Sequence, residues 1–276
     1  MNAGTQQERM LPPMGLVEPH SSMLSVPPDS QLLYKIVSVE NLLQSIQGDY
    51  LHFNRVDCYK DFSGADPHDG RQLPQDYAGN ARSKFQSSAD FSAANYYDHS
   101  RARTYACCFS LENTDYIWNN YANGSEKGKV CLVFNFGKLR ATLNKMLQPG
   151  QVWLFYNGVQ CHQIFSVNYG IVEYVEISTH QANAERLPNP IIYTYLKDKS
   201  FAEEKELRIS MSAAGVGQFF LSDNTLMEFP SSLKLAFNFR AAIADKTLQN
   251  ILFRSGTDTG FLKSELEKLH ISLANG

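Results

Sequence analysis

The sequence lacks the defining features of several large protein classes. No run approaches the roughly 18–20 apolar residues that cross a bilayer, and residues 1–30 lack the continuous apolar core of a secretory signal. The five cysteines form no C-x-x-C pair and the seven histidines show no H-E-x-x-H spacing, which disfavours a disulfide framework and a metal site. We therefore expect a cytoplasmic protein with no membrane partner and no bound metal.

An excess of charge of either sign is also missing. The chain has 25 Lys and Arg against 28 Asp and Glu, so its formal net charge of −3 provides no global attraction to nucleic acid. It contains neither a P-loop nor a G-x-G-x-x-G motif. What is abundant is aromatic side chains, at 12% of residues, which suit β-strands and a pocket with stacking walls. Composition thus indicates a β-rich globular protein.

Two polar segments divide the chain. Residues 1–29 contain five prolines and little periodic hydrophobicity, which predicts a flexible leader before a single domain over 30–276. Residues 57–103 are polar and poor in aliphatic side chains. A stretch of this length inside a compact domain is more often functional than a plain connection, so we expect a lid there.

The hydrophobic pattern predicts a strand, a short helix and a second strand at the start of the domain. Leu32–Val37 reads as the first strand, Ser38 caps a helix that ends at Gly48, and Tyr50–Phe53 forms the second strand. Further predicted strands are Thr104–Ser110, Lys129–Phe136 and Lys205–Met211, and further predicted helices are Asp115–Ala122, Lys246–Arg254 and Gly260–Leu269.

The strand that begins at Lys205 carries the most informative cluster of charges. Side chains of a strand alternate between its two faces, so Glu204, Glu206 and Arg208 are predicted to share one face. One interpretation is a solvated surface ion pair worth about 0–1 kcal/mol. The other is a functional site, which requires a second signal.

That signal comes from the opening segment. The residues from Leu33 to Ile46, followed by Leu51-His52-Phe53-Asn54, resemble the entry motif of DarT-like ADP-ribosyltransferases. The resemblance implies that Lys35 holds the nicotinamide side of NAD and that Glu206 acts at the ribose. Glu204-Lys205-Glu206 is similar to the Glu-x-Glu element of such transferases, which implies catalytic roles for Glu204 and Glu206.

A second resemblance spans roughly residues 32–210. It is to a largely uncharacterised bacterial family with six short motifs in a fixed order. The corresponding segments here are Leu33-Tyr34-Lys35, Tyr59-Lys60-Asp61-Phe62, Cys108-Phe109-Ser110, Ile117-Trp118-Asn119-Asn120-Tyr121-Ala122, Gly128-Lys129-Val130 and Glu204-Lys205-Glu206-Leu207-Arg208. The chain departs from the family's Phe-Asn-Asp-Pro turn at Lys60 and Phe62, so only Asp61 of that turn is carried over.

These resemblances imply an α+β, ADP-ribosyltransferase-like fold. Two small, mostly antiparallel sheets would form a cleft for NAD, with helices around its rim. NAD would be a substrate, and its binding residues would be Tyr34, Lys35, Phe53, Asn54, Asp61, Trp118, Tyr121 and Arg208. Cleavage of the nicotinamide–ribose bond builds positive charge on the ribose, which a carboxylate such as Glu206 stabilises.

The implied reaction transfers ADP-ribose to a macromolecule and releases nicotinamide. Nucleic acid is the expected acceptor, because basic residues gather in and around the expected lid at Arg55, Arg71, Arg82, Lys84, Arg101 and Arg103. Such enzymes are commonly toxins of toxin–antitoxin or phage-defence modules, which adds an antitoxin as a possible partner. The chain is similar in size to the mRNA-modifying toxin of a toxin–antitoxin–chaperone system. The alternatives are a protein acceptor and a non-catalytic nucleotide-binding or interaction module.

Overall fold

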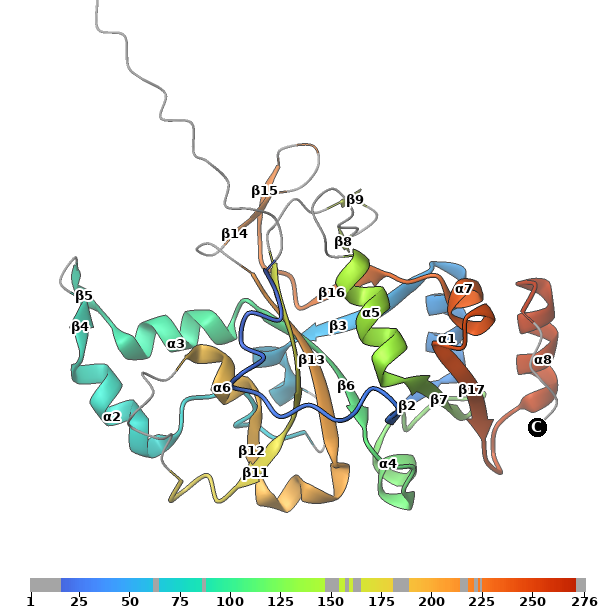
Figure 1. Cartoon of the computed structure of the whole chain (residues 1–276), viewed down its shortest axis with the longest axis horizontal. Helices are drawn as coiled ribbons and strands as arrows, with labels where there is room; N and C mark the ends of the chain where they lie inside the picture. Colours follow the sequence, from blue (N-terminus) through green and yellow to red (C-terminus); the bar gives the residue numbers. More distant parts are fainter. Residues whose placement is uncertain are drawn as a thin grey trace, which may run out of the picture.

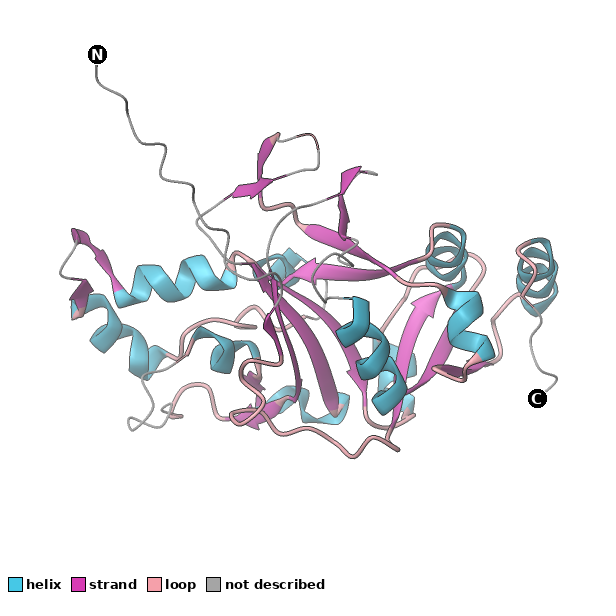
Figure 2. Ribbon diagram, turned by 45° about the horizontal axis from the view of Figure 1, so that its top comes forward, coloured by secondary structure: helices cyan, strands magenta, loops and turns pink. Residues whose placement is uncertain are grey.

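The computed structural model describes residues 16–61, 65–85, 88–146, 154–156, 159–160, 165–180, 189–213, 218–220, 223 and 225–271. In this part the chain has a mixed α/β fold, in which helices surround a mostly antiparallel sheet (Figures 1 and 2). The predicted combination of strands and helices is therefore confirmed. None of the described helices is both long enough and apolar enough to cross a membrane.

The helices lie between the strands along the chain, and the last helix follows the last strand. They are α1 (Val39–Gln47), α2 (Pro74–Arg82), α3 (Ala93–Arg101), α4 (Asp115–Asn120), α5 (Phe136–Met146), α6 (Pro190–Thr194), α7 (Phe239–Ala244) and α8 (Thr259–Lys268), with 3-10 turns η1 (Val56–Asp61) and η2 (Lys199–Glu204).

Eleven strands form the main sheet. They are β1 (Leu16–Val17), β2 (Leu32–Ser38), β3 (Tyr50–Arg55), β6 (Thr104–Ser110), β7 (Lys129–Asn135), β8 (Leu154–Tyr156), β9 (Val159–Gln160), β10 (Phe165–Ile171), β13 (Glu206–Ala213), β16 (Ser232–Ala236) and β17 (Leu248–Phe253). Three two-stranded sheets pair β4 (Lys84–Phe85) with β5 (Ser88–Ser92), β11 (Glu173–Val175) with β12 (Leu196–Asp198), and β14 (Gln218–Phe220) with β15 (Leu226–Glu228).

The main sheet forks at β6. One edge of β6 pairs with β13 along its whole length, from Thr104 to Ser110. Its other edge pairs with β3 at Tyr105 and Ala106 but with β2 only at Ser110. The branch that starts with β2 continues through β7 to β17. The expectation of two separate small sheets is corrected, because β6 belongs to both branches and joins them into one network.

The predicted strand–helix–strand unit is present as β2, α1 and β3. Ser38 accepts a hydrogen bond from the backbone N–H of Asn41, and Gly48 caps the other end of α1. The apolar face of α1 then packs into the main core, which also holds the inward-facing side chains of β6, β7 and β13. The main core thus packs against one face of the sheet at the point where its two branches meet.

The two segments that the sequence analysis separates from the rest, 57–103 and the expected leader, pack against the main sheet and its helices in their described parts. The described part of 57–103 folds as η1, α2, β4, β5 and α3, and α3 starts with a capping box between Ser92 and Asn95. Residues 16–29 are the described part of the expected leader. There β1 pairs in parallel with β10, and Glu18 forms an ion pair with Arg140 of α5. Whether 57–103 acts as a lid stays a prediction.

A buried charged cluster at the start of β13

Glu206 and Arg208 lie on the same face of β13, on the opposite face from Leu207 and Ile209, which enter the main core. Both charged side chains are almost completely buried, at 4% and 0% exposed. The guanidinium of Arg208 donates its Nε–H to Oε1 of Glu206 at 2.7 Å and one Nη2–H to Oε2 at 3.0 Å. The prediction that Glu206 and Arg208 share one face of the strand is confirmed. This face is buried in the protein and not exposed to solvent.

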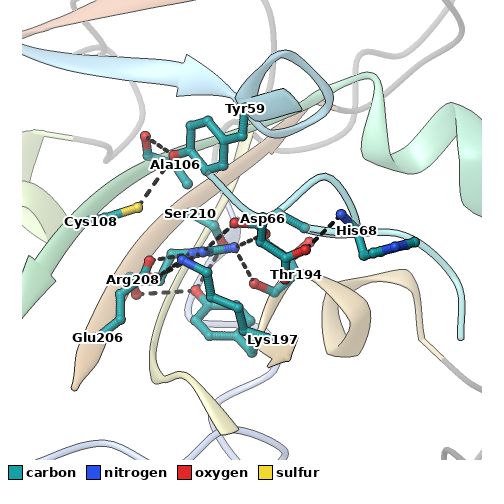
Figure 3. Close-up of polar contacts among 12 residues, drawn as sticks. Tyr59, Asp66, His68, Ala106, Cys108, Thr194, Lys197, Glu206, Arg208 and Ser210 are labelled. Carbon is teal, nitrogen blue, oxygen red and sulfur yellow. Dashed lines mark hydrogen bonds and ion pairs between the residues drawn. The ribbon is translucent and has the colours of Figure 1, made fainter. Parts of the chain in front are cut away.

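Every N–H of Arg208 has a partner. Asp69 accepts hydrogen bonds from Nη1 at 2.6 Å and from Nη2 at 2.9 Å. The carbonyl of Thr194 accepts a third hydrogen bond, from Nη1 at 2.7 Å (Figure 3). With the two bonds to Glu206, all five donors of the guanidinium are used. Two bidentate pairs therefore hold one buried cation between two carboxylates.

Glu204 reaches this cluster by another path than the one predicted. It is the last residue of η2, and Lys205 follows in the left-handed conformation with φ 46°, so the strand begins only at Glu206. The expectation that Glu204 shares a strand face with Glu206 is therefore wrong. Instead, Nζ of Lys197 on β12 forms ion pairs with Glu204 and, at 3.4 Å, with Oε2 of Glu206.

Burial and neighbouring charge push the two glutamates in opposite directions. Burial alone would raise the pKa of Glu206, but Arg208 and Lys197 outweigh it and hold that pKa well below its usual value. For Glu204, burial raises the pKa and the repulsion from Glu206 adds to it, while Lys197 offsets only part of the shift. The cluster thus contains one firmly ionised carboxylate next to one that protonates more readily.

These opposite shifts predict different effects on stability. At neutral pH, Glu206→Gln is expected to lower the free energy of unfolding, whereas Glu204→Gln is expected to leave it unchanged or raise it. The stability that Glu206 contributes is complete above the ordinary carboxyl pKa and is lost as pH falls through its lowered pKa. The ionisation of Glu204 costs stability, and this cost disappears as pH falls from its raised pKa toward the ordinary one.

Urea unfolding of both variants and the wild type, from about pH 4 to about pH 8, measures this difference. The deficit of Glu206→Gln should shrink toward acid pH. Equal losses in the two variants at neutral pH would contradict the opposite shifts.

Asp69 is presented by a tight turn. Oδ1 of Asp66 accepts from the N–H of His68 at 2.7 Å, and Arg71 N–H closes the turn on the carbonyl of His68 at 2.8 Å. Gly70 then takes φ +68°, and a Cβ on it would lie 2.5 Å from Cγ1 of Val56. The sequence places this turn in the polar segment 57–103 but does not connect it with Arg208.

Gly70→Ala is therefore expected to destabilise the protein by at least about 2 kcal/mol, because it combines a left-handed backbone with a steric clash. Gly79→Ala is the matched control. Gly79 lies inside α2 with nothing within 4 Å of an added Cβ, so this change should stabilise by about 0.5–1 kcal/mol. Thermal unfolding of both variants checks the pair, and a Gly70→Ala protein as stable as Gly79→Ala would contradict it.

Lys35 and Glu206 are both neighbours of Cys108, which lies on β6 where the sheet forks. Nζ of Lys35 donates to the carbonyl of Cys108 at 3.0 Å, where β2 and β6 have already separated. The Cys108 thiol lies next to the carboxylate of Glu206, and burial raises the pKa of this thiol. The hydroxyl of Tyr59 also lies 3.3 Å from Sγ of Cys108 (Figure 3). Lys35 thus contacts the backbone of Cys108 and lies 5.2 Å from the centre of the Phe109 ring, whereas Glu206 lies beside the side chain of Cys108.

Tyrosines surround the cluster. Tyr121 lies next to Glu204, and the hydroxyl of Tyr174 accepts a hydrogen bond from the backbone N–H of Glu206 at 2.8 Å. The ring of Tyr59 lies 5.7 Å from Cζ of Arg208. Of the predicted aromatic residues, Tyr121 is the one that reaches the cluster, and 39% of its surface is exposed.

The other predicted NAD-binding residues lie elsewhere. Phe53 is fully buried in the main core, and Tyr34 packs against a separate apolar cluster that contains Trp118, so in this structure these rings do not form walls of the site. Asn54 on β3 bonds Nε2 of His52 through Oδ1 at 2.9 Å. Asp61 ends η1, and its side chain lies outside the described residues.

Sequence reasoning missed two members of the cluster, Asp69 and Lys197. Lys197 stands in a run of buried residues before η2, and an isolated lysine in such a run is the signal that could have identified it. Asp69 had no such signal, because its partner is 139 residues away.

Several of the basic residues in and around 57–103 have partners inside the protein. Arg55 pairs with Asp57, and Nε of Arg101 donates to the carbonyl of Asp69 at 2.7 Å. Arg103 donates to the hydroxyl of Ser100 and lies over the ring of Tyr96. Exposed positions are Arg71, Arg82 and Lys84. Among the described residues, no group of His, Cys, Asp or Glu side chains is arranged to hold a metal ion.

Comparison with known proteins gives one partial match. Residues 117–209, about a third of the chain, match the model of a family described as a protein of unknown function, DUF2971. The matched part runs from α4 into β13 and includes Tyr121, Lys197, Glu204, Glu206 and Arg208. No curated protein and no solved structure matches the chain. In this region the chain is thus similar to a family without an assigned activity.

Proposed function

We propose that the chain transfers ADP-ribose from NAD to a nucleic acid at the buried charged cluster. The observation that carries the proposal is the position of Glu206, an ionised carboxylate that shares Cys108 as a neighbour with Lys35. A buried anion acts with little screening by water, so it stabilises the positive charge that develops on a ribose during loss of nicotinamide. Lys35 would bind an oxygen of the dinucleotide.

The two glutamates suit different steps of such a transfer. Departure of nicotinamide breaks the bond between its ring nitrogen and C1′ of the ribose, and the electron pair of that bond leaves with nicotinamide. An oxygen or nitrogen of the acceptor then bonds to C1′ and releases its proton. Glu204, whose pKa is raised by burial, is the group in the cluster best suited to accept that proton.

The route to the cluster would pass Tyr121. Its ring is the exposed member of the group around Glu204, whereas Lys197, Glu204 and Glu206 are each less than 10% exposed. NAD would therefore have to displace the Tyr121 ring, which would then serve as a stacking surface. The exposed basic residues Arg71, Arg82 and Lys84 offer contacts for a phosphate backbone.

The complete pairing of Arg208 favours a second candidate, a binding or interaction module in which the cluster is structural. All five donors of the guanidinium are satisfied inside the protein, as in a buried ion-pair network that fixes one packing arrangement. On this interpretation the purified protein releases no nicotinamide.

Incubation of the full chain with NAD labelled in its adenosine part separates the two functions. Transfer to nucleic acid predicts free nicotinamide and label that is sensitive to nuclease when RNA or DNA is supplied. Label that is sensitive to protease would move the acceptor to protein. Absence of both nicotinamide release and label transfer, with RNA, DNA and cellular protein each supplied, would overturn the proposed enzyme activity.

A further inference from the structure

A second site lies in a pocket beside α4. The pocket has a volume of about 360 Å³ and is lined by Trp118 and Asn119 of α4, Gly128 and Lys129 at the start of β7, and the turn Arg254–Thr257 that follows β17. Two cations and no carboxylate line it. Its volume is at the lower end of the range for small-ligand pockets, roughly 300–1,000 Å³. The pocket therefore suits a compact anionic ligand.

One wall of this pocket is a stack of two flat groups. Cζ of Arg254 lies 4.6 Å from the centre of the Trp118 ring, and the ring itself is held by a hydrogen bond from Nε1 to Oδ1 of Asn113 at 2.6 Å. Asp115 fixes Arg254 from the side with an ion pair of 2.6 Å. The Arg254 side chain remains 41% exposed, so the guanidinium can receive a planar ligand on its outer face.

The opposite wall carries positive charge and free donors. Nζ of Lys129 donates to the carbonyl of Tyr121 at 2.8 Å and to Oδ1 of Asn123 at 2.6 Å, which are both neutral acceptors and leave one N–H of the ammonium group. In the described part of the chain, the backbone N–H groups of Ser255 and Gly256 donate to no protein acceptor. An added Cβ on Gly256, at φ +95°, would meet nothing within 4 Å. The turn is thus open to a ligand.

We propose that this pocket binds a phosphorylated nucleoside, whose base stacks on Arg254 and whose phosphate contacts Lys129 and the backbone N–H groups of Ser255 and Gly256. Because every nucleobase has a flat π-face, stacking on the guanidinium of Arg254 does not depend on which base the ligand carries. Backbone N–H groups and an ammonium group are typical donors to phosphate. The ligand is either a free nucleotide or one nucleotide of a single strand, since both present the same chemistry.

Calorimetric titration of the full chain with AMP, adenosine and a five-residue oligoadenylate, in the absence of NAD, tests this site. AMP is expected to bind, and both Arg254→Ala and Ser255→Glu should weaken it at least tenfold, by loss of stacking and by repulsion of the phosphate. Lys268→Ala is the control, because Lys268 is an exposed lysine with an ion pair in α8, and it should change AMP affinity less than twofold.

The ligand series identifies the source of the nucleotide. Tighter binding of the oligoadenylate than of AMP, with a steep dependence on salt, supports a single strand, and equal binding supports a free nucleotide. Equal affinities for adenosine and AMP would show that the phosphate makes no contribution to binding and would overturn the proposal. AMP binding that Glu206→Gln abolishes and Arg254→Ala preserves would place the ligand at the buried cluster and also overturn it. Because NAD is absent, none of these outcomes depends on the transferase activity.

Discussion

Arg208→Met is expected to lower the free energy of unfolding by about 3–5 kcal/mol, the cost of breaking a buried ion pair from one side. Methionine fills much of the volume of arginine but leaves Glu206 and Asp69 without their shared cation. Both carboxylates are buried, so water cannot replace the five hydrogen bonds that are lost. Urea unfolding at neutral pH measures the change.

Arg254→Met provides the matched control for this loss. Arg254 also forms an ion pair with an aspartate at 2.6 Å, but its partner, Asp115, has 82% of its side chain exposed. Its removal should therefore cost about 1 kcal/mol or less. A similar loss in the two variants would mean that the Arg208 network contributes no more than a surface ion pair, contrary to its burial.

Glu206→Gln is expected to slow nicotinamide release from NAD at least about 100-fold, comparable to the loss of one preorganised electrostatic group in an active site. The change keeps the size and one oxygen of the side chain but removes the negative charge beside the ribose. Lys197 and Arg208 then each lose one of their two carboxylate partners, and this excess of positive charge further disfavours a cationic transition state. Single-turnover assays with labelled NAD give the rate of the chemical step.

Because Glu206→Gln is also expected to reduce stability, its activity has to be compared at a temperature where circular dichroism shows it folded. Glu112→Gln is the matched control, since Glu112 forms an exposed ion pair with Lys205 and should leave the rate unchanged. A folded Glu206→Gln protein that releases nicotinamide at the wild-type rate would exclude Glu206 as the catalytic carboxylate.

Local signals in the sequence predict the elements that frame the site. The run Thr104–Ser110 is β6 as predicted, and Ser38 and Gly48 cap α1 as their residue types indicate. Period-two alternation correctly placed Glu206 and Arg208 together. Each of these features depends on neighbours within a few residues, which is why they can be predicted without knowledge of tertiary contacts.

Other predictions were wrong where tertiary contacts override local pattern. The sequence predicts a helix over Lys246–Arg254, but Leu248–Phe253 forms β17, which pairs with β7 across a bulge. Glu204 left the strand face because Lys205 takes φ 46°, a conformation that is uncommon for a lysine. The partner of Arg208 came from a turn 139 residues earlier, which no local pattern specifies.

The ion pair between Arg208 and Asp69 links the position of the Asp69 turn to the protonation of Glu206. Asp69 belongs to the segment that continues into α2 and α3, so an outward movement of its turn would break a pair that is buried and poorly screened by salt. The same movement would remove one of the two carboxylates that hold the guanidinium of Arg208 next to Glu206, and this guanidinium keeps Glu206 ionised. Opening of this segment and the proton affinity of Glu206 therefore change together, and a ligand that favours the open state would also alter the protonation of this carboxylate.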